Sequence, residues 1–106
     1  TMAAVGEASR LAEAAGVDLA KLGDVVRHSD KVTGGAGSTM LRTTTAPLDA
    51  DDGLFPIFTH TRELGLKDLD LALALAAEHG LDLPFARLAH QNLGRALGVP
   101  EPHDPI

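Results

Sequence analysis

Apolar residues recur at helical spacing in the first third of the chain. A repeat of three or four residues between positions 5 and 15 predicts a helix over about residues 2–15. Gly16 follows it, in the place where a left-handed residue ends a helix. Asp18 is then the expected N-cap of a second helix over about residues 19–29. The apolar positions of the two helices are Val5, Ala8, Leu11, Ala12, Ala15, Leu22, Val25 and Val26.

The most apolar stretch lies further along and predicts the longest helix, over about residues 61–79, ended by Gly80. Leucines occupy two of its faces, which indicates a central helix that is covered from more than one side. One stripe is Leu66, Leu69, Leu73 and Ala76, and the other is Leu64, Leu71 and Leu75.

A last helix is predicted over about residues 84–97, because Pro84 suits a first helical turn and Gly98 suits its end. Its apolar stripe is Phe85, Leu88, Ala89, Leu93 and Ala96. No stretch alternates as a strand would, so the fold class expected is all-α, a bundle of four main helices forming one domain over residues 1–98. Residues 99–106 form a proline-rich tail. The expected core includes Leu69, Leu73, Leu88 and Leu93.

Composition narrows the function classes for this chain of 106 residues. A hydrophobic content of 44% is typical of a folded domain. A net charge of −6 and only three aromatic residues argue against nucleic acid, which requires a basic face and stacking platforms. No apolar run is long enough for a membrane span, and no signal peptide is recognisable, so we expect a cytoplasmic protein. The absence of cysteine excludes disulfides and thiol chemistry.

Several polar patterns have a plain structural interpretation. Residues 34–37 read Gly-Gly-Ala-Gly, and an inter-helix turn is favoured over an anion-binding loop because no strand precedes them. A short helix is expected over residues 38–43. His60 and Glu63 have the i, i+3 spacing of two metal ligands, but no further ligands are at hand, so no metal site is expected. The other histidines, hydroxyl residues and their neighbours show no spacing typical of a catalytic triad. These are His28, His79, His90, His103, Ser29, Ser38, Thr43, Thr44 and Thr45.

Lys67 and Asp68 differ from these residues because they interrupt the most apolar helix. Charges near a core are costly unless they are paired or serve a site. The alternative is that both side chains point to solvent on a charged face shared with Glu63 and Asp70. The residues by themselves leave the two interpretations open.

The order of these motifs resembles a known family. Gly-Leu-Lys-Asp-Leu at 65–69, Leu-Ala-Leu-Ala at 71–74, Gly-Leu-Asp-Leu-Pro at 80–84 and the segment 7–18 are similar to the C-terminal domain of the 3-hydroxyisobutyrate dehydrogenase and 6-phosphogluconate dehydrogenase superfamily. The resemblance extends over about residues 4–97. It implies a helical domain that walls a substrate cleft and forms a homodimer. We therefore expect a piece of a longer protein.

The resemblance also implies where the chemistry lies. In this family an N-terminal Rossmann domain binds NAD or NADP, and a lysine with a nearby asparagine, which would precede Thr1, acts as general acid and base. No catalytic residue and no cofactor are therefore expected for this chain alone. Lys67 and Asp68 would line the cleft near cofactor and substrate, and His60 stands where the family usually has phenylalanine. A stand-alone helical interaction module without catalytic activity remains the alternative function.

Overall fold

In the computed structural model, residues 1–30 and 35–102 are described, and they contain four α-helices and one short 3-10 helix but no strand. The helices are α1 (Met2–Ala14), α2 (Leu19–Asp30), α3 (Leu54–Glu78) and α4 (Pro84–Leu97), and the 3-10 helix is η1 (Ala36–Thr39). The all-α fold class is confirmed. The chain divides into two compact units, residues 1–46 and 47–106.

Three helices end in the same way, each at a glycine with positive φ. Gly16, Gly80 and Gly98 have φ values of 86°, 65° and 77°. In each case the next residue donates its N–H to the carbonyl five positions earlier, as from Val17 to Ala12 and from Leu81 to Ala76. This Schellman arrangement satisfies carbonyls that a helix end would otherwise leave unpaired. The glycine stops predicted from the sequence are therefore confirmed.

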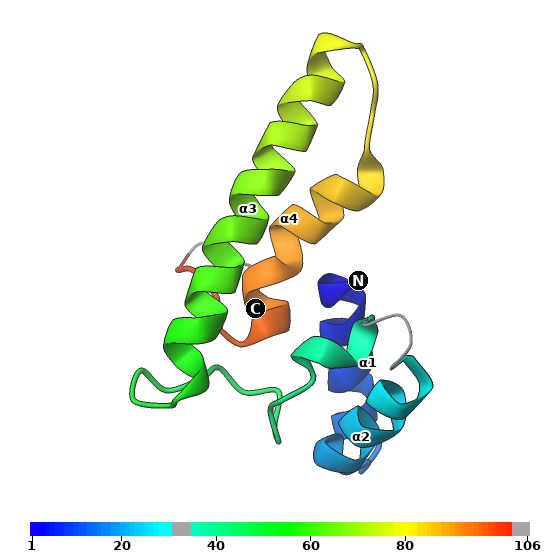
Figure 1. Ribbon diagram of the computed structural model, residues 1–106, viewed down its shortest axis with the longest axis vertical. Coiled ribbons are helices and arrows are strands. Elements are labelled where there is room, and N and C mark those ends of the chain that lie inside the picture. The colour runs from blue at the N-terminus through cyan, green and yellow to red at the C-terminus, as the bar shows by residue number, and fades with distance from the viewer. Residues whose placement is uncertain (31–34, 103–106) are drawn as a thin grey trace. The chain divides into compact units, whose positions relative to one another are not determined.

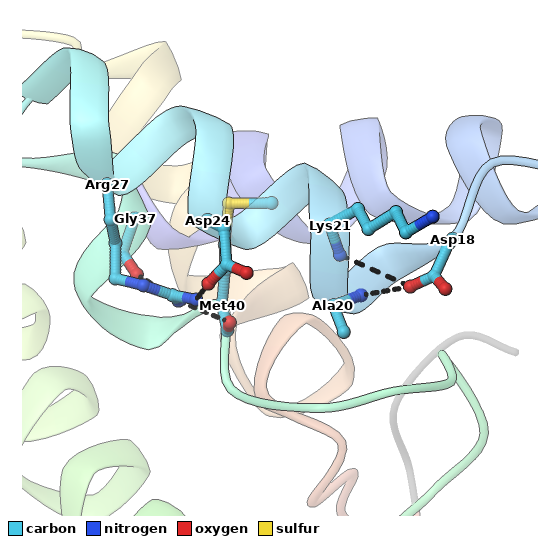
Figure 2. Close-up of polar contacts among 7 residues, drawn as sticks. All are labelled: Asp18, Ala20, Lys21, Asp24, Arg27, Gly37 and Met40. Atoms are coloured by element: carbon cyan, nitrogen blue, oxygen red, sulfur yellow. Dashed lines mark hydrogen bonds and ion pairs between the residues drawn. The ribbon is translucent and has the colours of Figure 1, made fainter.

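The first unit consists of α1, α2 and η1. Asp18 caps α2 as predicted, with Oδ1 accepting from the N–H groups of Ala20 and Lys21 at 2.9 and 3.2 Å. Figure 2 shows Arg27 reaching from α2 to the carbonyls of Gly37 and Met40, at 3.2 and 2.7 Å. The guanidinium thereby fixes the η1 segment against α2.

One prediction for the first unit is wrong. The helix expected over residues 38–43 is η1, and residues 40–43 are not helical. The apolar stripe of α1 is not a buried face, because Leu11 is largely exposed and Gly6 is the residue of α1 that is buried.

The second unit is built on the pair α3 and α4, which lie side by side after the chain reverses at Gly80 (Figure 1). The α4 prediction of 84–97 is confirmed, but α3 begins at Leu54, seven residues before the predicted start. Pro56 is compatible with this earlier start, because a proline in the first turn lacks only an N–H that would have no helical partner. Just before the helix, the Asp52 carboxylate accepts from the Leu54 N–H at 2.8 Å, and Gly53 is the N-cap residue.

One of the predicted core residues, Leu88, is not in the core of the second unit. Leu93 is buried and Leu69 and Leu73 are half-buried, but Leu88 is 57% exposed. Leu88 precedes Leu93 by five residues, which turns it about 140° away from the buried side of α4. The buried side of α4 is instead formed by Leu93, Gly94 and Leu97.

The residues after α4 pack onto the second unit. Val99 is buried, and its carbonyl accepts from Arg62 Nη1 at 2.6 Å. The Arg62 guanidinium also lies 3.6 Å from the Glu101 carboxylate, and the Gly98 carbonyl accepts from the Leu48 N–H at 2.8 Å. Residues 98–101 are non-helical, as predicted for the tail after α4, and Arg62 of α3 contacts them at Val99 and Glu101.

Candidate functional site

Lys67 and Asp68, the sequence-predicted site residues, lie near the middle of α3 and are both exposed. His60, two turns before Lys67 on α3, is also exposed. A spacing of seven residues is close to two helical turns, so His60 and Lys67 share one side of the helix. The structure therefore brings these two residues to one face, with Asp68 on the edge of it.

Large apolar residues occupy the same face of α3. Ile57, Leu64, Leu71 and Leu75 are between 44% and 64% exposed, and they follow one another at spacings of seven, seven and four residues. We call these four residues together with His60 and Lys67 the α3 ridge. Leu64 and Leu71 lie one turn to either side of Lys67, so the amine extends from an apolar surface. This chain by itself does not cover the second leucine stripe, so its predicted cover stays a prediction.

The opposite side of α3 packs against α4, and this fixes the direction of the ridge. Gly65 lies so close to α4 that a Cβ there would be 2.6 Å from Leu93 Cδ2. Asp70 Oδ1 is 2.7 Å from His90 Nε2, which links the two helices by their side chains. The packing of Gly65 and the Asp70–His90 contact therefore turn Lys67 outward.

Within the part of the chain that the structure describes, Lys67 has neither an ion pair nor a side-chain hydrogen bond. Glu63 and Asp70 stand four residues before it and three after it, at the spacings where helical ion pairs form. Asp70 instead contacts His90. Lys67 and Asp68 are therefore not a buried ion pair, and the Lys67 ammonium is left available to an anion.

The Lys67 ammonium and the Asp68 carboxylate can bind anions and hydroxyl groups. An ammonium group is a strong donor to a carboxylate or a phosphate, and the surrounding leucines lower the local polarity around such a contact. The Asp68 carboxylate accepts hydrogen bonds from hydroxyl groups. These groups bind and orient, and no nucleophile with an adjacent base accompanies them among the described residues.

The other candidates from the sequence are dispersed. The described residues contain no group of three histidines or carboxylates placed to hold a metal ion. His103 and Gly34 lie outside the described residues. The Gly37 N–H donates to Asp30 Oδ2 at 2.7 Å, so that amide of the glycine cluster is occupied by a carboxylate of the same chain. No described helix has the length and apolar character to cross a membrane.

A polar cluster in the first unit was not anticipated. Glu13 accepts hydrogen bonds from the Thr45 hydroxyl and from the Thr45 N–H, the latter at 2.9 Å. These bonds lower the pKa of the Glu13 carboxyl below its ordinary value. Burial lowers the pKa of Arg42 nearby, an effect that the Glu13 charge partly offsets. The partners are 32 residues apart in the sequence, so no local pattern signals the contact.

Sequence reasoning also missed Arg62 and Ile57, for different reasons. Arg62 positions α3 by a contact with a carbonyl 37 residues away, which nothing in the local sequence indicates. Ile57 could have been found, because it continues the seven-residue spacing of Leu64 and Leu71 to an earlier turn.

A family model, two protein relatives and a crystal structure that match this chain are all described as dehydrogenases or oxidoreductases. Residues 1–101 match the family described as NAD-binding of NADP-dependent 3-hydroxyisobutyrate dehydrogenase. Two uncharacterized oxidoreductases of Mycobacterium tuberculosis, from strains CDC 1551 and H37Rv, are each 60% identical over 100 residues, which cover 94% of this chain and 34% of each relative. A crystal structure named as that of an oxidoreductase from Mycobacterium avium 104 is 55% identical with a TM-score of 0.63, covering 93% of this chain and 36% of that one. The chain thus spans about one third of the length of these relatives.

Proposed function

We propose that this chain, which belongs to the NAD-binding family of NADP-dependent 3-hydroxyisobutyrate dehydrogenase, is the helical C-terminal domain of an NAD(P)-dependent oxidoreductase for small β-hydroxyacids. Its α3 ridge would wall the cleft in which cofactor and substrate meet. The observation that carries the proposal is the position of Lys67, an exposed ammonium without a partner among the described residues, at the centre of an uncovered apolar ridge.

The exposed ridge supports a cleft, because leaving it in water is unfavourable. Burial of one leucine or isoleucine side chain contributes roughly 1.5–3 kcal/mol, and the ridge holds four such side chains. Covering the ridge with another part of the protein would therefore be stabilising. The relatives contain, beyond the matched third, about twice as much sequence again, and that sequence could supply the covering part. We propose that the cover is an N-terminal Rossmann domain of the same protein.

The roles of the three residues follow from their chemistry. Lys67 would bind the substrate carboxylate or a cofactor phosphate, and Asp68 would orient the substrate through a hydroxyl group. His60, on the same face as Lys67, would contact the polar end of the substrate. The dinucleotide supplies the hydride acceptor when it is bound, and the general acid and base would come from the N-terminal half.

Lys67 and Asp68 supply only part of the contacts that a dinucleotide needs. One ammonium and one carboxylate suit contacts to one end of a cofactor or to a small acid. A pyrophosphate needs bare amides at a strand-to-helix turn, and the described residues contain no strand. We infer that this chain completes a binding site whose phosphate-binding part lies in the other half.

The alternative function is a helical interaction module without chemistry, and the exposed leucines favour it as much as they favour a cleft wall. An activity assay of the longer protein distinguishes the oxidoreductase from the interaction module. NAD⁺ and NADP⁺ are supplied with a panel of short 3-hydroxy acids, and the absorbance of the reduced nicotinamide is followed. Reduction that depends on a hydroxy acid is the expected result. Failure of both dinucleotides with every acid would contradict the proposal and favour the interaction module.

Homodimerisation is a further part of the proposal. The second unit exposes Leu81, Phe85 and Leu88 in addition to the ridge. Exposed apolar surface beyond a single cleft is typical of proteins that assemble.

A further inference from the structure

We propose that His90 of α4 is a positioning residue for Lys67 of α3. By holding the Asp70 carboxylate on the α4 side of α3, His90 keeps that carboxylate from pairing with Lys67 and leaves the ammonium to an anion. The inference rests on the proposed function, in which Lys67 binds a substrate carboxylate or a cofactor phosphate. It concerns His90, to which that proposal gives no role.

The contact between His90 and Asp70 joins the two helices of the second unit. Nε2 of His90 lies 2.7 Å from Oδ1 of Asp70, and the two residues are 20 positions apart in the sequence. An ionised carboxylate only accepts hydrogen bonds, so Nε2 is the donor, in the neutral Nε2–H tautomer or in the imidazolium. The two side chains are 35% and 68% exposed, so the carboxylate remains within reach of other groups at the surface.

Lys67 is the competing partner for the Asp70 carboxylate. Asp70 follows Lys67 by three residues, which places it about 60° around the helix and about 4.5 Å along it. Oppositely charged side chains at this spacing form ion pairs on helix surfaces. Among the described residues, however, Asp70 pairs with His90 and Lys67 has no ion pair. The contact between the helices has therefore taken the place of the contact along α3.

Glu63 is the other acid at a pairing distance from Lys67, four residues before it, and it is exposed. It lies two helical turns from Asp70, so substitution of His90 does not act on it directly. Competition from Glu63 is then the same with and without His90, and it cancels when the variants are compared.

A released Asp70 would compete with the substrate for one ammonium. The substrate anion would then have to displace a carboxylate of the same chain, which raises KM without changing the chemical step. In water such a pair changes the availability of the amine by only about 1.5- to twofold. Beneath a covering domain the lower effective dielectric strengthens it, so the effect on KM should be about three- to tenfold.

The reactivity of the Lys67 amine in the 106-residue chain tests the proposal without an assay of activity. Acetylation by N-hydroxysuccinimidyl acetate is followed by peptide mass spectrometry, with Lys21, an exposed lysine of α2, as the reference in the same sample. His90→Ala should slow the acetylation of Lys67 by about 1.5- to twofold, because an ion-paired ammonium loses its proton less readily. His90→Gln keeps an N–H donor and should react like wild type.

A second substitution separates positioning from a merely structural role. Asp70→Asn in the His90→Ala background does not restore the lost contact, but it removes the competing charge. The double variant should therefore regain the wild-type rate at Lys67, whereas Asp70→Asn alone should change that rate little. In the longer protein, His90→Ala should raise KM for the hydroxy acid with kcat retained, and the double variant should restore KM.

An unchanged acetylation rate in His90→Ala, or a slowed rate that Asp70→Asn does not restore, would overturn the proposal. The kinetics distinguish its failure from that of the oxidoreductase proposal. A KM that responds to Lys67→Ala but not to His90→Ala contradicts the positioning role alone. The expected acetylation pattern in a protein without turnover supports the positioning of Asp70 and contradicts the oxidoreductase.

Discussion

Gly65 of α3 and Leu93 of α4 occupy adjoining space, so that a Cβ at position 65 would stand 2.6 Å from Leu93 Cδ2. The end of the Leu93 side chain thus fills the space that a side chain at position 65 would need. This contact lies on the side of α3 opposite to the ridge, and it determines which residues face outward.

Gly65→Ala is therefore expected to destabilise the protein. Alanine gains up to about 1 kcal/mol over glycine in a helix, but overpacking against a buried leucine costs roughly 1–3 kcal/mol. The expected net loss is about 1 kcal/mol, measured by urea denaturation. In a Leu93→Ala background the same substitution should instead stabilise, because the clash is gone and only the helix preference remains. Equal effects in both backgrounds would contradict the contact.

Arg62 is expected to stabilise the second unit through the segment that follows α4. Its Nη1 donates to the Val99 carbonyl at 2.6 Å, and its side chain is 15% exposed. A charge-assisted hydrogen bond of this kind contributes roughly 1.5–3 kcal/mol, which Arg62→Ala should remove from the free energy of unfolding. Arg87→Ala is the control, because its exposed pair with Asp82 should contribute less than about 1 kcal/mol. A loss no greater for Arg62 than for Arg87 would show that the segment is not held in this way.

The Glu13–Thr45 contact predicts a dependence of stability on acid. Hydrogen bonds from Thr45 lower the pKa of Glu13 from its ordinary value of 4.5 in the folded state. The contribution is therefore fully present above pH 4.5 and is lost as the pH falls through the lower, folded-state value. Thr45→Val should raise the pKa of Glu13, as followed by carboxyl NMR titration. Thr44→Val removes an exposed neighbouring hydroxyl and should leave that titration unchanged.

The chain alone should bind dinucleotides weakly, although its family is described as NAD-binding. The reason is that one lysine and one carboxylate offer few of the contacts that a pyrophosphate needs. Calorimetric titration with NADH and NADPH measures this directly. Micromolar affinity for either would mean that a phosphate site exists in these 106 residues.

Local signals account for what the sequence could predict. Gly16, Gly80 and Gly98 mark three helix ends, and Asp18 marks a start, because caps are formed by neighbours in the chain. The first seven residues of α3 were missed because the leucine stripes that identify this helix begin later, at Leu64 and Leu66. The family resemblance was confirmed, since it depends on the order of several motifs.

Tertiary contacts account for what the sequence could not predict. Leu88 and Leu93 both belong to the apolar pattern of α4, and the packing of α4 on α3, which places Leu93 beside Gly65, decides which is buried. Likewise, periodicity identified Leu64 and Leu71 as a stripe, but not whether this chain covers it. Lys67 and Asp68 were predicted as site residues from the family resemblance, and their cleft role stays a prediction.

The most direct measurement of the central claim is the catalytic efficiency of the longer protein with Lys67 replaced. Lys67→Ala should lower kcat/KM by about ten- to a hundredfold, through the loss of roughly 1.5–3 kcal/mol of charge-assisted hydrogen bonding to substrate or cofactor. The thermal midpoint should be unchanged, because Lys67 is exposed and has no intrachain partner among the described residues. Lys21→Ala, an exposed lysine on α2, serves as the control and should retain wild-type kinetics. Wild-type kcat/KM in a well-folded Lys67→Ala protein would contradict the account and remove the α3 ridge from the active site.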